Sequence, residues 1–585
     1  PIYKNPDEPD IYTHFDMGWL DHLGLLKIDL LGLKTLQEIE LTLKYLNRKG
    51  IELDINQIPL DDQRVLDLFG EGNTVGIFQF EKPMMRNSLK RLKPDRLEDL
   101  VAMNALNRPG PMAMMDEYIA RRHGRKPVSY PHPKLEPILK ETYGIIVYQE
   151  QVMRIATELG GFTFAQADLL RKAMGKKKQE VMDELSVEFI EGLKRSGIEE
   201  AIAQEIFNLC QQFARYGFVK AHSVGYAIIA YQCAYLKAYY PSEYLAACLT
   251  VRANDPDQML LLIADCREMG IKILPPDINE SEVSFIPTDE GIRFGLAALK
   301  NVGEAAAQTI LEVRQQVGRF QSLSHFISSV DSRIINKRVL EALIDSGALD
   351  GFGYSRAALQ AALPALIAYI QAVSREKERE HIGLFGTNDS FASTLPEPGI
   401  QNILEWPPKE LLSREKKVLG YFISGHPLDK ISPAWDPLFP HHLGEKELFV
   451  PNQNLRLKGV ITRVDRKTNQ KGERWATFIL EDEKGFIECM AFSQIYNISN
   501  HLIVNDNIVA IKGTVWKGDD NDIPRIQLDE IYTLDDAVTK WCHTLKIRVN
   551  YDAISHPLVH RLKTLFQKYS GKSRVLLEVV KNGDK

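Results

Sequence analysis

Residues 25–31 read LLKIDLL, a short apolar run that predicts a β-strand. A helical pattern follows at once, with apolar residues every three or four positions and Gly50 placed to end the helix. Lys27 and Asp29 are two positions apart, so on a strand their side chains share one face. A carboxylate beside an ammonium group in such apolar sequence is costly to bury unless it is paired or bound to metal. A salt-bridged strand end and a metal site both fit this pattern.

Asp29 alone is one carboxylate, which is too few for a two-metal phosphoryl-transfer site. Such a site needs several carboxylates to hold two cations about 4 Å apart. Asp61-Asp62 precedes a helix-like stretch and is predicted to cap that helix. Asp519-Asp520 lies in a turn-like stretch between two expected strands. The other acidic pairs therefore do not complete a metal site.

The composition bounds the class of protein. The 585 residues suggest about four domains at roughly 150 residues each. With 72 basic and 78 acidic side chains the formal charge is −6, which argues against a uniformly basic nucleic-acid coat but not against local patches. The six cysteines form no C-x-x-C pair, which favours buried reduced thiols in a cytoplasm over a disulfide scaffold or a zinc knuckle. No signal peptide or membrane span is expected, and a start at Pro1, almost directly within patterned sequence, indicates a fragment.

The pattern along the chain changes several times. Residues 60–250 are mostly helical in pattern, with basic clusters at the turns. After Pro275-Pro276 come a short β-like stretch, a glycine-punctuated helical pair and a helix over 355–380. Residues 386–410 are rich in Pro, Ser, Thr and Asn and are predicted to be a linker. Alternating strands follow over 455–532, and the last 45 residues predict a strand, a helix and another strand.

Two basic stretches are candidate anion sites. LLRKAMGKKK (169–178) places cations around a glycine at a helix end, which suits a polyphosphate or a nucleic-acid backbone, although a solvated helix face also fits. YGFVKAHS (216–223) places a cation and a histidine in a turn between helices, where a lone histidine is more often structural. The candidate residues are Arg171, Lys172, Lys176, Lys220 and His222.

An ordered set of motifs resembles the palm end and fingers of the family C bacterial replicative DNA polymerases. Each motif alone is weak, but eight in the same order exceed chance, and the match continues through the later modules. The motifs are LLKIDLLGL (25–33), PLDD (59–62), IFQFE (77–81), NRPGP (107–111), YGIIVYQEQVM (143–153), DLLRKAMGKKK (168–178), YGFVKAHS (216–223) and ILPPDIN (273–279).

The resemblance implies roles for residues already singled out. Asp29 would be the third metal-binding aspartate of the palm, with Lys27 near the reacting phosphates. Two Mg²⁺ ions would be shared with a D-x-D pair that, like the family's N-terminal phosphoesterase-like domain, lies outside this sequence. The two basic stretches would approach the incoming triphosphate or the nearby template.

The implied function is that of a DNA-directed DNA polymerase, a nucleotidyltransferase. It would add deoxynucleotides to a primer 3′ end by two-metal phosphoryl transfer, with the catalytic site incomplete in this fragment. The implied partners are primer-template DNA, deoxynucleoside triphosphates, a sliding clamp, a clamp-loader subunit and a proofreading exonuclease, in the cytoplasm and with no membrane. The alternative is a non-catalytic nucleic-acid-binding and replisome-assembly protein.

Residues 299–310, LKNVGEAAAQTI, are similar to a helix-hairpin-helix. In that motif the hairpin amides, here at Val302 and Gly303, receive a DNA phosphate without reading base sequence. Asn301 stands where the hairpin usually has its first glycine, and asparagine tolerates the left-handed conformation. A weaker second half is LIDSGALDGFG (343–353), and an ordinary helical hairpin also fits.

The strands over 455–532 number five, in an order that fits an OB-fold, which binds single strands through cationic grooves and stacking aromatics. Trp475, Phe478 and Trp516 are candidate stacking residues. Most aromatic side chains in so small a barrel belong to its core, so we expect only one to stack. Trp475 and Phe478 are the two selected as DNA-binding candidates.

EREHIGLFG (378–386) is similar to the family's short sliding-clamp peptide. Leu384 and Phe385 match its apolar pair, while His381 stands where glutamine is usual, so the polar half of the contact differs. A hydrophobic anchor that packs on its own domain also fits.

The expected fold is a multidomain α+β protein with the end of a β-rich palm, mainly helical fingers, a helix-hairpin-helix region, an OB-fold barrel and the start of a small α/β module. The expected boundaries are 1–50 for the end of the palm, 51–255 for the fingers, 256–355 for the helix-hairpin-helix region, 356–445 for the clamp-binding segment and linker, 446–535 for the OB-fold and 536–585 for the start of a clamp-loader-binding module.

Overall fold

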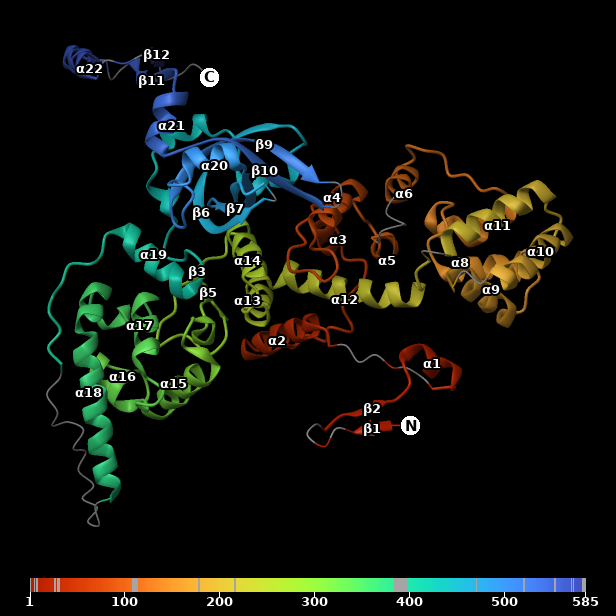
Figure 1. The fold of residues 1–585 in the computed structure, drawn as a ribbon, viewed down its shortest axis with the longest axis horizontal. Helices are drawn as coiled ribbons and strands as arrows, with labels where there is room; N and C mark the ends of the chain where they lie inside the picture. The colour runs from red at the N-terminus through yellow and green to blue at the C-terminus, as the bar shows by residue number, and fades with distance from the viewer. Residues whose placement is uncertain are drawn as a thin grey trace.

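The structure is a computed structural model that combines mainly helical regions with a closed barrel and smaller sheets (Figure 1). It describes residues 2–4, 6, 9–25, 28, 32–107, 114–176, 179–214, 217–382, 398–469, 471–518, 521–551, 554–569, 571 and 573–580.

The N-terminal part is helical after a short antiparallel hairpin, β1–β2. Gly50 follows the second helix with φ +76° and Asp62 Oδ1 accepts the Val65 N–H (3.2 Å) at the start of the third, so both predicted helix boundaries are confirmed. The elements are β1 Ile2–Lys4, β2 Ile11–Thr13, α1 Met17–His22, α2 Lys34–Arg48, α3 Gln63–Gly70, α4 Pro83–Leu92, α5 Leu97–Leu106, α6 Met115–Arg122, α7 Glu136–Leu139, α8 Gln149–Arg154, α9 Phe164–Lys176, α10 Gln179–Arg195, α11 Glu200–Ala214, α12 Lys220–Tyr239, α13 Pro241–Val251 and α14 Pro256–Glu268.

These helices build two cores. One is shared by α2–α6, α12–α14 and the region that follows, and the other lies within α7–α11. In Figure 1 the helices α8–α11 form a lobe to one side, while α12 runs toward it from the first core. Helix α12 packs along α5 and α3, so its first residue is held where the two cores meet.

The next region carries a three-stranded sheet, β3-β5-β4, and four helices. Asn301 has φ +74° immediately before α15, which confirms that asparagine takes the left-handed position of the hairpin. The predicted helix over 355–380 is confirmed as α18. The elements are β3 Ile273–Leu274, β4 Ile286–Thr288, β5 Gly291–Arg293, α15 Gly303–Val317, α16 Leu323–Ser329, α17 Lys337–Asp345 and α18 Arg356–Ile382.

Within the described residues, α18 contains one stretch, Arg356–Arg375, that is long and apolar enough to cross a membrane by length and composition. This stretch was not expected from the sequence. Its leucines at 359, 363 and 366 are buried in the protein core against α16 and α17. The stretch is therefore a core helix of this region.

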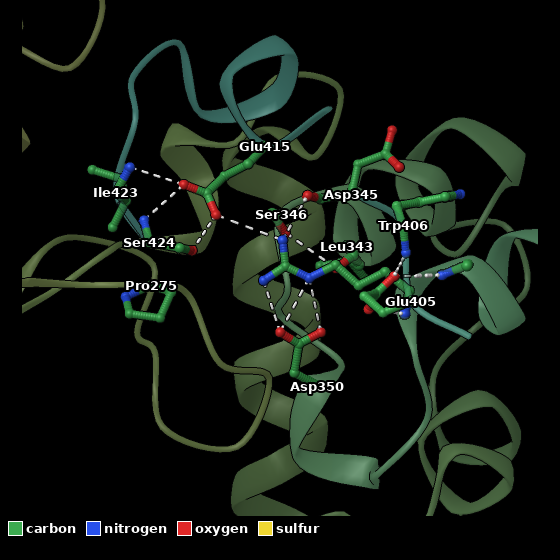
Figure 2. A network of polar contacts seen from close by, with 12 residues as sticks. Pro275, Leu343, Asp345, Ser346, Asp350, Glu405, Trp406, Glu415, Ile423 and Ser424 are labelled. Atoms are coloured by element: carbon green, nitrogen blue, oxygen red, sulfur yellow. Dashed lines mark hydrogen bonds and ion pairs between the residues drawn. The ribbon is translucent and has the colours of Figure 1, made fainter. Parts of the chain in front are cut away.

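A buried polar network ties the start of α18 to residues 398–424 (Figure 2). The Arg356 guanidinium donates to Asp350 (2.7 Å) and lies 3.6 Å from the carboxylate of Glu415. Glu415 belongs to the 398–424 segment and is fully buried. Glu405 accepts the backbone N–H of Arg356 (2.8 Å) and so caps α18. Part of the predicted linker is thus bound to the core, and it leads into α19, Pro408–Leu419.

Five strands form a closed barrel in the order β10-β8-β7-β6-β9, so the predicted OB-fold is confirmed. Strands β8 and β10 pair in parallel and the other neighbours pair antiparallel. The sequence analysis missed a short helix, α20, between the third and fourth strands. The elements are β6 Asn454–Thr468, β7 Arg474–Glu481, β8 Phe486–Ala491, α20 Ser493–Ser499, β9 Ile508–Gly518 and β10 Asn521–Tyr532.

The last residues form a βαβ unit beyond the barrel, and its predicted strand–helix–strand order is confirmed (Figure 1). Its two strands pair in parallel over their whole length. Many of its apolar side chains are exposed, among them Val559, Leu577 and Val579. The elements are α21 Leu534–Trp541, which was not predicted, β11 Thr544–Asn550, α22 His556–Lys568 and β12 Arg574–Val580.

Candidate functional site

Two of the motifs quoted above meet at the start of α12. Tyr148 and Phe218 form a parallel β-bridge, although they are 70 positions apart. Gln149 donates its backbone N–H to the Phe218 carbonyl (3.0 Å) and its side-chain Nε2 to the Gly217 carbonyl (2.7 Å). The segment YGIIVYQEQVM is therefore hydrogen-bonded to the segment YGFVKAHS.

The third motif joins them through Arg171 on α9. Its Nη1 donates to Gln149 Oε1 (3.0 Å), and its Nη2 and Nε donate to Asp168 Oδ1 (2.8 and 3.0 Å). Lys172 Nζ lies 2.8 Å from the other oxygen of the same carboxylate. Hydrogen bonds from Lys172 and Arg171 lower the pKa of Asp168 below its usual value, so this carboxylate is charged at neutral pH.

Lys220 is held from two sides. Its backbone N–H, at the first residue of α12, lies 2.9 Å from both oxygens of Glu150, a favourable place for a carboxylate at a helix N-terminus. Its Nζ lies 2.7 Å from the Glu141 carboxylate and 5.5 Å from the centre of the buried Tyr148 ring. Burial, with Glu141 next, raises the pKa of Tyr148 far above its usual value, so the phenol stays neutral.

His222 lies in the first turn of α12 and is exposed. Its ring meets the Tyr226 ring edge-on, with the centroids 4.2 Å apart, and lies 5.4 Å from Phe218. Tyr226 in turn contacts Phe78, which belongs to the motif IFQFE. A fourth motif therefore borders the same place, which we call the α8–α9–α12 junction.

The α8–α9–α12 junction consists of Glu141, Gln149, Glu150, Asp168, Arg171, Lys172, Lys220 and His222. The structure thus brings together four of the five predicted cationic or histidine candidates. Lys176 is the last residue of α9, and its side chain lies outside the described part of the chain. Two carboxylates, Asp168 and Glu141, contact the described cations, and a third, Glu150, accepts the backbone N–H of Lys220; none of the three was assigned a role from the sequence.

Some of these carboxylates could have been identified from the sequence. Asp168 is the first letter of DLLRKAMGKKK and stands three and four positions before its partners, a spacing that brings helical side chains together. Glu150 lies inside a quoted motif. Glu141 is 79 positions from Lys220, so only the fold reveals that pair.

Two predicted sites, the palm pair and the clamp segment, fall outside the described residues. Lys27 and Asp29 are not described, and neither are Leu384 and Phe385 nor the His381 side chain. Among the residues that are described, no three or more His, Cys, Asp or Glu side chains are grouped so as to hold a metal ion. The described residues do not by themselves fit the two Mg²⁺ ions.

The DNA-binding candidates differ in accessibility. Val302 is buried and its backbone N–H donates to the Leu299 carbonyl (3.2 Å), while Gly303 is exposed with φ +73°. Trp475 is half-buried and stacks on Phe492, with centroids 5.9 Å apart and planes at 27°. Phe478 is 1% exposed in the barrel core and offers no ring face to a base, so we correct its assignment to a core residue.

Most of the cysteines are buried in the described structure. All six are free and five of them are buried. Burial raises the pKa of the Cys210 thiol to about 12, which keeps it protonated at neutral pH. The expectation of buried thiols is confirmed for these five.

Comparison with known proteins connects these regions. Family models match three successive parts of the chain. They are the bacterial DNA polymerase III alpha subunit finger domain over residues 35–197, a helix-hairpin-helix motif over 270–359 and an OB-fold nucleic acid binding domain over 455–534.

Curated relatives extend the similarity to nearly the whole chain. The DNA polymerase III subunit alpha of Thermus aquaticus is 39% identical over 97% of this chain and 46% of its own length. The proteins of the same name from Pseudomonas aeruginosa and Mycobacterium tuberculosis strain H37Rv are 37% and 36% identical, over 99% and 100% of this chain and 52% and 50% of theirs. Over nearly its whole length the chain is similar to DNA polymerase III alpha subunits. It spans about half the length of the relatives it matches.

The match to the finger-domain model gives the junction a context. Gln149, Asp168 and Arg171 lie inside the finger-domain match, whereas Lys220 and His222 lie beyond its last residue, 197. The junction is therefore built from the part of the chain that matches the finger domain and from the start of α12, which lies beyond that match.

Proposed function

We propose that this chain is part of a replicative DNA polymerase and that the α8–α9–α12 junction holds the phosphates of the incoming deoxynucleoside triphosphate. The observation that carries the proposal is the convergence of Arg171, Lys172 and Lys220 at one place in a chain similar to DNA polymerase III alpha subunits. A triphosphate concentrates negative charge, and guanidinium and ammonium groups bind its oxygens through charge-assisted hydrogen bonds.

The chemistry is two-metal phosphoryl transfer from the triphosphate to the primer 3′-hydroxyl. Asp29 would supply one ligand, and the remaining aspartates would come from outside these 585 residues. The metals, Mg²⁺, would stabilise the charge that develops on the transferred phosphate. The role of the described residues is to bind and orient the triphosphate.

The later modules would hold the DNA. The exposed amide of Gly303 at the start of α15 suits a backbone phosphate, and Trp475 on the barrel suits a stacked base. The remaining partners, a sliding clamp, a clamp-loader subunit and a proofreading exonuclease, belong to the same proposal, as does a cytoplasmic location.

The test compares this chain with a complete subunit that includes it. We expect no Mg²⁺-dependent primer extension by the chain alone, because one carboxylate cannot hold two metals. In the complete subunit, Asp29→Asn should abolish synthesis and leave duplex binding nearly unchanged, measured by fluorescence anisotropy. Robust extension by the chain alone would contradict the proposed division of the catalytic site.

The clamp segment has its own test. Replacing Leu384 and Phe385 together with Ala should abolish binding to a sliding clamp without changing the melting temperature, because side chains that await a partner add nothing to the stability of the free protein. His381→Gln should tighten the binding. A lower melting temperature with clamp binding intact would make the two residues internal anchors.

A further inference from the structure

Each described cation of the α8–α9–α12 junction already contacts a carboxylate. Asp168 lies 2.8 Å from both Arg171 and Lys172, and Glu141 lies 2.7 Å from Lys220. An incoming polyanion would therefore not meet bare positive charge at these side chains. It would have to share or replace the two carboxylates.

These ion pairs are partly exposed, so another anion can replace their carboxylates. The side chains of Arg171 and Asp168 are 28% and 30% exposed, and those of Lys220 and Glu141 are 37% and 34% exposed. Ion pairs that remain in contact with water are weak, because water and other ions compete with the partner. Both pairs can be exchanged for a stronger anion.

A pair elsewhere in the same helical region is built differently. Arg122 and Asp99 are 8% and 0% exposed and lie 2.6 Å apart, and Arg122 Nε also donates to the same carboxylate (3.0 Å). Breaking it would leave a buried charge without a partner, so it is a fixed structural pair. Glu150 is also distinct, because its described hydrogen bonds are to the backbone N–H of Lys220, where it caps α12.

We propose that Asp168 and Glu141 are displaceable counter-ions, which occupy the junction's cations until triphosphate oxygens replace them. The inference rests on the proposed function. Because the two carboxylates hold cations on separate helices, an anion must reach both Arg171 and Lys220 to displace both. A triphosphate can compensate for both exchanges, whereas a small monovalent anion cannot, so the carboxylates set selectivity for polyphosphates.

A competing interpretation predicts the opposite change in nucleotide binding. If Asp168 instead orients Arg171, as Gln149 does from the other side, removing its charge should weaken nucleotide binding. If Asp168 competes with the nucleotide, removing its charge should strengthen binding. The direction of the change therefore decides between a counter-ion and a positioning residue.

The experiment uses the complete polymerase with Asp168→Asn and Glu141→Gln, which keep the side-chain volume. We expect each variant to lower the KM for deoxynucleoside triphosphates by about two- to five-fold, the range for a partly exposed ion pair. Inhibition by pyrophosphate should strengthen by a similar factor, and kcat should not rise. Glu191→Gln is the matched control, since it removes an exposed pair with Lys194 (2.9 Å) on α10, away from the described junction contacts.

Each outcome separates this inference from the proposed function. If Arg171→Ala and Lys220→Ala raise the KM but both carboxylate variants leave it unchanged or raise it, the counter-ion role is overturned and the nucleotide site stands. If the two cation variants leave both KM and kcat unchanged, the nucleotide site itself fails. The two carboxylates lie on different segments, so a folding defect in one variant, detected by its melting temperature, leaves the other to decide.

Discussion

The cations of the α8–α9–α12 junction and of the OB-fold barrel lie in contrasting surroundings. In the α8–α9–α12 junction, Arg171 and Lys220 contact carboxylates. On the barrel hairpin formed by β6 and β7, Lys467 lies 5.2 Å from the centre of the Trp475 ring, directly across the strand pair. Trp475 is itself stacked on Phe492.

The difference matches two kinds of anion. A carboxylate can be replaced by a compact anion of higher charge, so a paired cation suits a triphosphate. A cation beside an aromatic ring offers a phosphate contact and a stacking face together, which suits a flexible single strand. The same residue type thus has different uses, and the neighbour decides which.

The largest expected effect concerns the barrel's own aromatics. Phe478→Ala should destabilise the barrel by about 3–5 kcal/mol, because it leaves a cavity in the core. Trp475→Ala, three positions earlier on β7, should change the stability of the barrel far less because that ring is only half-buried. Amide hydrogen exchange of β7 and β8 measures both. Equal protection in the two variants would contradict the division between core and surface rings.

The division between core and surface rings could have been predicted from the sequence. Ala476, Phe478 and Leu480 alternate along β7 and are all buried, so they share the face that points into the barrel. Trp475 lies on the opposite face of the strand. The five strands were predicted correctly, but the alternation was not used to separate stacking candidates from core residues.

The pairing at the junction was less accessible. The motifs identified the cations, and helical spacing alone could have paired Asp168 with Arg171 and Lys172. No local rule links Glu141 to Lys220, or Gln149 to Gly217, because those contacts depend on how α8 meets α12. Sequence reasoning found the positive charge and missed its partners.

The next largest effect tests the junction. Arg171→Ala in a complete polymerase should lower kcat/KM for nucleotides by about 10- to 100-fold, since hydrogen bonds to charged groups contribute roughly 1.5–3 kcal/mol. Adding a Lys176 neutralisation should lower it further, while duplex binding stays nearly constant. Arg154→Ala is the control, because it removes an exposed arginine that pairs with Glu158 (2.7 Å). Unchanged steady-state kinetics would reduce the cluster to a solvated face.

A smaller effect tests the barrel hairpin. Trp475→Ala should weaken single-stranded DNA binding by this chain by about 1–3 kcal/mol, the range for one base stacked on an aromatic ring. Trp475→Phe should retain much of the affinity. Anisotropy titrations with a short labelled oligonucleotide measure both. If the alanine variant binds as tightly as the original chain, the Trp475–Phe492 stack serves only the barrel.

The smallest effect separates the two regions most directly. Neutralising one cation that contacts a single strand should reduce the slope of log K against log salt by about 0.7, because one fewer counter-ion is released. Lys467→Gln should produce this change for single-stranded DNA, since Lys467 lies beside the stacking ring. Lys172→Gln should leave that slope unchanged, because Lys172 is paired with Asp168 and is assigned to the nucleotide. If both variants reduce the slope equally, the strand contacts the junction as well, and its cations are not reserved for a triphosphate. If neither variant reduces the slope, Lys467 serves only to pack against Trp475. The contrast between the two surroundings would then concern folding and not ligand binding.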